Sequence, residues 1–93
     1  MDEGKGKEEV MDAYITYLIR IEYDQFGCVS SQRVISYKRG NSPLEVGDFS
    51  AQILSRYYVY RSIVIPNMSE SIRQFNAYAK ARGFIWDCVP IVA

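Results

Sequence analysis

The clearest pattern in the chain is the alternation of apolar and polar residues over positions 13–24. Alanine, isoleucine and tyrosine occupy the odd positions, and the even positions become polar after Leu18. A period of two is typical of a β-strand with one buried and one solvated face. The many β-branched and aromatic side chains favour the same structure. We therefore predict a strand here, with Arg20 and Glu22 on its wet face.

A turn and a second strand follow. Residues 24–27 end in Gly27, which suits a positive φ, and residues 28–39 form a weaker and more polar alternation. In this second strand we expect Val29 and Ile35 to share one face with Arg33. Charge of this kind is common at sheet edges, where it discourages stray pairing. The pattern predicts an N-terminal β-hairpin with an edge-like second strand.

The next segments alternate between loop, short helix and strand. Residues 39–48 are rich in Gly, Asn, Ser and Pro and predict a loop. The apolar run up to Pro66 is too long for one ordinary strand. We divide it into a short helix near 48–55, capped by Asp48, and a strand over 57–65. One long bent strand is the alternative.

The last part of the chain predicts a helix and a final strand. The helix spans residues 69–83, begins after a capping-box spacing between Asn67 and Glu70, and ends at Gly83. Its apolar stripe consists of Ile72, Phe75 and Ala79. Residues 84–92 then predict a strand that Pro90 places at a sheet edge.

This order of elements predicts one small α+β domain. We expect a sheet of about four strands, an N-terminal hairpin followed by a βαβ unit, with the main helix packed on one face. The domain spans residues 11–93, and residues 1–10 form a flexible acidic leader. The chain has 93 residues, 48% of them hydrophobic, which suits one domain with a modest core.

The formal net charge is zero but is unevenly distributed. Residues 1–12 hold five acidic residues and two lysines, whereas residues 13–93 hold nine basic and six acidic residues. A mildly basic body is compatible with an anionic partner, although a mixed soluble surface is the simpler explanation. The polar start and the absence of a long apolar run lead us to expect a cytoplasmic protein without a membrane segment.

Catalytic chemistry is poorly represented in the sequence. The chain has no histidine and two cysteines, so the common triads and zinc sites cannot be assembled within it. We therefore expect no enzyme activity, no cofactor and no metal. A carboxylate–metal enzyme using Glu22, Asp24 and Asp87 is kept as a third hypothesis, because carboxylates are ligands for Mg²⁺.

The segment SRYYVYRS, residues 55–62, carries the main functional hypothesis. On a strand, Tyr58 and Tyr60 share a face with Arg56, and tyrosine and arginine are enriched at binding hot spots. A helix over this face would instead make both tyrosines part of the core. The candidate partner-binding residues are Arg56, Tyr58, Tyr60, Arg33, Lys38 and Arg39.

We accordingly expect a non-catalytic protein-binding module that regulates or inhibits a larger macromolecule. The same tyrosines could stack bases, so single-stranded nucleic-acid binding is the alternative. An edge strand would also permit a homodimer.

Overall fold

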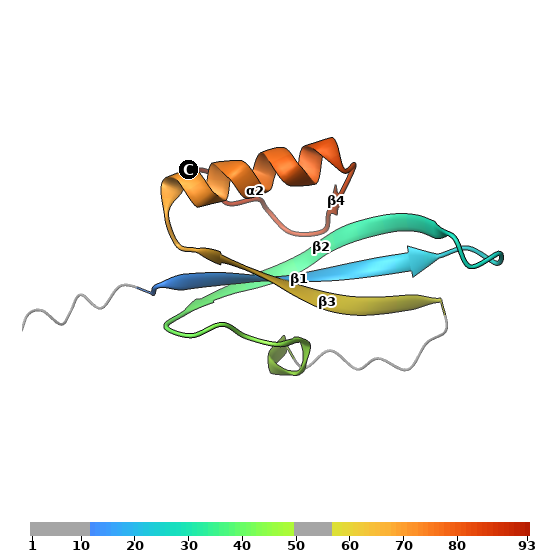
Figure 1. The fold of residues 1–93 in the computed structure, drawn as a ribbon, viewed down its shortest axis with the longest axis horizontal. Coiled ribbons are helices and arrows are strands. Elements are labelled where there is room, and N and C mark those ends of the chain that lie inside the picture. The colour runs from blue at the N-terminus through green and yellow to red at the C-terminus, as the bar shows by residue number, and fades with distance from the viewer. Residues whose placement is uncertain (1–11, 50–56) are drawn as a thin grey trace, which may run out of the picture.

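A computed structural model describes residues 12–49 and 57–93 and shows a four-stranded mixed sheet with one main helix on one face (Figure 1). The α+β prediction is confirmed. The elements are β1 (Tyr14–Tyr23), β2 (Val29–Gly40), the 3-10 helix η1 (Val46–Phe49), β3 (Tyr58–Pro66), α2 (Ser69–Ala81) and β4 (Ile85–Trp86). The expected acidic leader lies outside the described residues, and so does most of the expected helix near 48–55.

β1 is the centre of the sheet, whose strand order is β3-β1-β2-β4. It pairs antiparallel with both β2 and β3, while β2 pairs parallel with β4. The polar strand β2 was expected at an edge, but it lies between β1 and β4. β4 is short and pairs only with Arg33 and Val34 of β2. β3 and β4 lie at opposite edges, and α2 crosses the sheet between them (Figure 1).

The main core lies between β1 and α2. The apolar stripe of α2 is buried as predicted, against the odd-numbered side chains of β1. The ring of Tyr17 stacks on Phe75, with 3.9 Å between centroids and 11° between planes, and Trp86 packs edge-on against both rings. Aromatic contacts of this kind add to the hydrophobic gain and fix the position of the helix on the sheet.

A β-bulge in β2 decides which of its side chains enter this core. Leu18 pairs with Ser36 but Ile19 pairs with Val34, so Ile35 is the extra residue of the bulge. Val34 is consequently fully buried on the α2 side. Arg33 lies opposite Arg20, on the other face. The expectation that Arg33 shares a face with Val29 and Ile35 is therefore wrong, because Val29 pairs with Tyr23 and Ile35 is the bulged residue.

The second face of the sheet is covered over its first half. Residues 41–49 cross beneath β1 (Figure 1), and the backbone N–H of Leu44 donates to Thr16 Oγ1 at 3.1 Å. Thr16 and Leu18, which share this face of β1 with Arg20 and Glu22, are almost completely buried there. The loop satisfies the Thr16 hydroxyl, so this polar group is buried at little cost.

The sequence predicted the C-terminal end of α2 but not the cap at its N-terminal end. The expected capping box is wrong, because Asn67 donates its side-chain N–H to the carbonyl of Asp12 and the N-cap residue Met68 makes no side-chain cap. At the other end Gly83 has φ +72°, and the N–H of Phe84 donates to the Ala79 carbonyl. This is a Schellman C-cap.

Within the described part of the chain, no helix has the length and apolarity to cross a bilayer.

Substituting Gly83 by Ala should lower the free energy of unfolding by roughly 1–2 kcal/mol, because an L-residue at positive φ is strained. A Cβ at this position would have no neighbour within 4 Å, so the cost is in the backbone alone. Urea unfolding measures it. Gly47→Ala, where an added Cβ also meets nothing within 4 Å, should be close to neutral. Equal effects of the two changes would contradict this explanation.

Replacing Tyr17 by Phe should raise stability by about 1 kcal/mol at neutral pH, because its buried hydroxyl has no hydrogen-bond partner among the described residues. Burial also raises the pKa of Tyr17 to about 12. A tyrosine in the unfolded chain ionises near pH ~10, so ionisation favours unfolding above that pH. The advantage of Tyr17→Phe should therefore grow as the pH rises from ~10 toward ~12 in urea unfolding experiments. The exposed Tyr14→Phe variant controls for the loss of a hydroxyl.

Candidate partner-binding face

The second half of the sheet face opposite α2 gathers polar and aromatic side chains from three strands. Cross-strand pairing places Glu22 between Ser31 and Tyr58, and Arg20 between Arg33 and Tyr60. Residues directly opposite each other on neighbouring strands point to the same face. We call this surface the tyrosine face; it consists of Arg20, Glu22, Ser31, Arg33, Tyr58 and Tyr60.

Glu22 is the centre of the charge network on the tyrosine face. Its Oε2 lies 2.9 Å from both Nε and a terminal nitrogen of Arg20, and its Oε1 accepts from Arg33 Nε at 3.3 Å. The hydroxyl of Ser31 also donates to Oε1. The hydrogen bond from Ser31, followed by that from Arg33, lowers the pKa of Glu22. Glu22 thus stays ionised and screens the two facing arginines from each other.

Asp87 extends this network to the opposite edge of the sheet. Its carboxylate Oδ1 lies 3.1 Å from a terminal nitrogen of Arg33, and its backbone N–H donates to the Val34 carbonyl at 2.9 Å. Arg33 therefore sits between two carboxylates, those of Glu22 and Asp87. A guanidinium held in this way has little positive charge left to offer a further anion.

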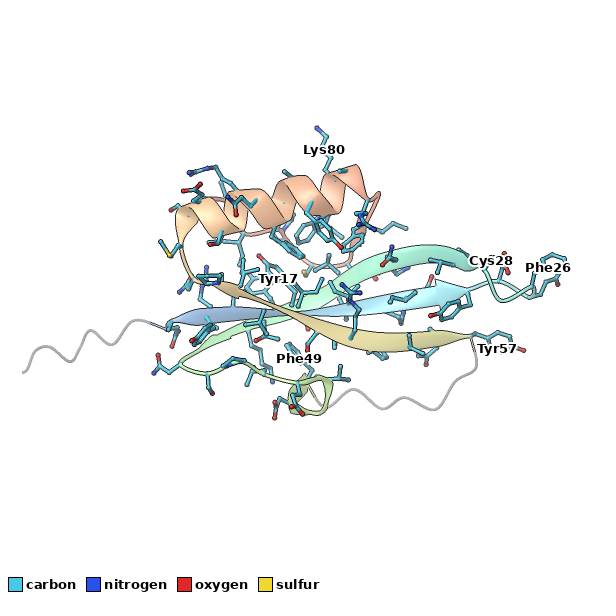
Figure 2. All side chains as sticks on the ribbon, in the orientation of Figure 1. Tyr17, Phe26, Cys28, Phe49, Tyr57 and Lys80 are labelled. Carbon is cyan, nitrogen blue, oxygen red and sulfur yellow. The ribbon has the colours of Figure 1, made fainter. Side chains whose placement is uncertain are left out.

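The two tyrosines form an aromatic pair next to the charge network. The rings of Tyr58 and Tyr60 meet edge-to-face with 5.7 Å between centroids, and the guanidinium carbon of Arg20 lies 5.3 Å from the Tyr58 centroid. A hydrogen bond to Tyr60, and then the charge of Glu22, raise the pKa of Arg20 above its ordinary value. Both tyrosines are half-buried. α2 lies on the other side of the sheet, as Figure 2 shows from Tyr17, so it does not bury them.

The remaining predicted site residues do not all join this surface. Lys38 lies on the same sheet face, but its Nζ donates to the Asp48 carbonyl at 2.8 Å. The Nζ also lies over the ring of Phe49, which Figure 2 shows below the sheet. Arg39 pairs with Ile15 and so lies on the α2 side, which separates it from the tyrosine face. Arg56 lies outside the described residues.

The three carboxylates of the metal hypothesis are engaged separately. Arg33 bridges Glu22 and Asp87, while Asp24 Oδ1 accepts from the backbone N–H groups of Phe26 at 2.8 Å and Cys28 at 3.0 Å. Among the described residues no three side chains of the metal-binding types come together. Asp24 therefore stabilises the hairpin turn, and Glu22 and Asp87 position Arg33.

Sequence reasoning did not find the role of Arg20 and Ser31 in this site. Arg20 was visible on the polar face of its strand, but its partners depend on the register across the hairpin. The bulge at Ile35 moves Arg33 opposite Arg20, and two arginines in that position favour a carboxylate between them. The charged residues on the polar face of β1 therefore indicated a site, but the sequence did not show which residues they contact.

No protein-family model matches the chain, and neither does any curated protein or solved structure. The tyrosine face is therefore interpreted from its own chemistry.

Replacing Glu22 by Gln should destabilise the protein by about 1 kcal/mol at neutral pH, because Arg20 and Arg33 then face each other without a carboxylate. The lowered pKa of Glu22 means that its stabilisation is present above pH ~4.3 and is lost as the pH falls through the folded-state value. The difference between wild type and Glu22→Gln in urea unfolding should shrink below that pH. Glu45→Gln, an exposed carboxylate, is the matched control; a difference independent of pH would argue against the ionised network.

Proposed function

We propose that this protein is a small non-catalytic protein-binding module that regulates or inhibits a larger macromolecule through its tyrosine face. The observation that carries the proposal is the pair Tyr58 and Tyr60, half-buried and held against Arg20 on the face that α2 leaves uncovered. Tyrosine and arginine dominate binding hot spots because each combines a large contact area with polar groups that remain able to hydrogen-bond.

The rigidity of the cluster supports this function. Arg20 is fixed by Glu22 on one side and by the Tyr58 ring on the other, and the backbone beneath them is the paired centre of the sheet. A long side chain that is already ordered loses little conformational entropy when a partner binds. The tyrosine face is therefore prepared for contact with a partner at low entropic cost.

A regulatory or inhibitory mode of action fits the available chemistry. The chain has no histidine, and the strongest polar cluster in its described residues consists of ion pairs that satisfy one another. Groups that are mutually neutralised hold a surface in shape and do not supply a general base or a nucleophile. A protein of this kind would act by occupying a surface of its partner.

Single-stranded nucleic-acid binding is the second candidate function. The two tyrosine rings could stack on bases, but the cations that would meet phosphates are already engaged: Arg33 by two carboxylates and Lys38 by the Asp48 carbonyl. The carboxylates of Glu22 and Asp87 also add negative charge where a phosphate backbone would run. Phosphate-driven affinity requires free basic side chains, so the charge arrangement favours a protein partner.

The proposal predicts that the double variant Tyr58→Ala/Tyr60→Ala loses its partner. Tagged wild type and variant are used for affinity capture from a lysate of the source organism, with and without nuclease, and captured proteins are quantified. A true partner should be at least about tenfold depleted with the variant and should survive nuclease. The variant should lose stability by only about 1 kcal/mol per tyrosine, checked by thermal unfolding.

Phe26→Ala is the matched control, because Phe26 is an 80% exposed aromatic residue on the hairpin turn, away from the tyrosine face. Its capture profile should equal that of wild type. Partners retained equally by all three proteins would contradict a role of the tyrosines. Recovery of nucleic acid, with affinity for a single-stranded oligonucleotide that falls steeply with salt, would favour the second function instead.

A further inference from the structure

Among the described residues, the outer edge of β3 has no strand partner and carries a regular row of backbone groups. Within the described residues β3 pairs with β1 alone. The N–H of Tyr23 donates to the Tyr57 carbonyl, and the N–H of Asn67 donates to the Ala13 carbonyl. Both pairs continue the register of the β1–β3 ladder, in which Ile15 pairs with Ile65. In an antiparallel ladder the hydrogen-bonded pairs alternate, so odd-numbered residues of β3 bond to β1. The even-numbered residues from Tyr58 to Val64 direct N–H and C=O outward.

An apolar groove runs beside this edge on the α2 side. It has a volume of about 330 Å³, and Ile63 and Ile65 of β3 line one wall while Phe75 and Tyr78 of α2 line the other. The dimensions are those of a small binding pocket, large enough for an aliphatic or aromatic side chain. A strand added to β3 would point every second side chain toward this groove.

Arg61 supplies the charge within the lining of the groove, whereas the Glu70 carboxylate lies outside the lining and accepts from the lining residue Gln74 at 3.3 Å. Arg61 lines the groove, is exposed, and makes no ion pair with any described residue. The guanidinium carbon of Arg82 lies 5.1 Å from the ring centroid of Tyr78, at the other wall. No Asp or Glu side chain is among the described residues that line the groove. A carboxylate on the partner would therefore meet uncompensated positive charge there.

We propose that β3 and the groove between β3 and α2 bind an extended acidic segment of the partner protein as an additional strand. A carboxylate of this segment lies opposite Arg61, and an apolar side chain two positions away lies opposite Ile63 and enters the groove. The side chain between them points to the opposite face beside Ser62, and the next side chains on that face, beyond Arg61, lie beside Tyr60 and Tyr58. This inference rests on the proposed protein-binding function and adds the chemistry of the bound segment.

A second copy of the chain is a poorer occupant of this edge. The only charged residue within β3 is Arg61. Antiparallel pairing of β3 with itself would place Arg61 opposite another Arg61 or opposite an uncharged residue, in every register. It would supply no carboxylate, and facing arginines repel each other. Charge complementarity thus favours a foreign acidic strand over a homodimer.

The test selects ligands for the full-length protein from a displayed library of short random segments. Enriched segments should carry Asp or Glu two positions from Leu, Ile, Val or Phe, in either chain direction. Arg61→Glu should weaken their binding by at least about tenfold in fluorescence polarisation. Arg73→Glu, an exposed charge on α2 that does not line the groove, should leave it unchanged. Methylation of alternate amide nitrogens of a selected segment should abolish binding, and methylation of the others should be tolerated.

Several outcomes would overturn the inference. Selected segments without the acidic spacing, no enriched segment at all, or equal effects of Arg61→Glu and Arg73→Glu would each do so. Concentration-dependent dimerisation in sedimentation that Arg61→Glu abolishes would assign the edge to a second copy. Competition by a peptide of residues 2–11 would assign it to the chain's own acidic segment.

The same experiments separate this inference from the proposed function. Segments or captured partners that depend on Tyr58 and Tyr60 but not on Arg61 would leave the tyrosine face as the binding site and remove the added strand. Segments that depend on Arg61, together with partners unaffected by the two tyrosine substitutions, would retain the edge site and contradict the proposed function of the tyrosine face.

Discussion

The stacking of Tyr17 on Phe75 is the contact on which the rest of the molecule depends. It lies between the central strand β1 and the helix α2, and Trp86 of β4 packs against both rings. A small domain has few buried residues, so one aromatic cluster supplies a large share of its hydrophobic stabilisation. Once α2 is fixed on one face, the loop over residues 41–49 and the tyrosine face must share the other.

That division of the second face links the fold to the proposed function. The first half is closed by the loop, which buries Thr16 and Leu18, whereas the second half presents the network around Glu22 and the tyrosine pair. Among the described residues, the side chains there are ordered by their contacts with one another. A surface that is both ordered and accessible is suited to recognition, because binding then requires little reorganisation.

Much of the architecture was predictable because it depends on local periodicity and backbone conformation. The alternation in β1, the stripe of α2 and the positive φ at Gly27 and Gly83 all follow from the residues themselves. The position of Arg33 was not predictable, because the bulge at Ile35 exchanges the faces of the β2 residues from Val34 back to Ser31, where a second irregularity shifts the register again. The expected capping role of Asn67 failed for a similar reason, since its side chain bonds to Asp12 far away in the sequence.

The sequence by itself determined the class of fold, the segments that become strands and helix, and the tyrosine and arginine side chains available for a site. These properties follow from short-range patterns, which local chemistry fixes. Only the tertiary structure decided that β3 is an edge strand, that α2 lies opposite Tyr58 and Tyr60, and that Glu22 joins Arg20 to Arg33. Those relations depend on strand order and register, which long-range packing selects from several arrangements that the same pattern allows.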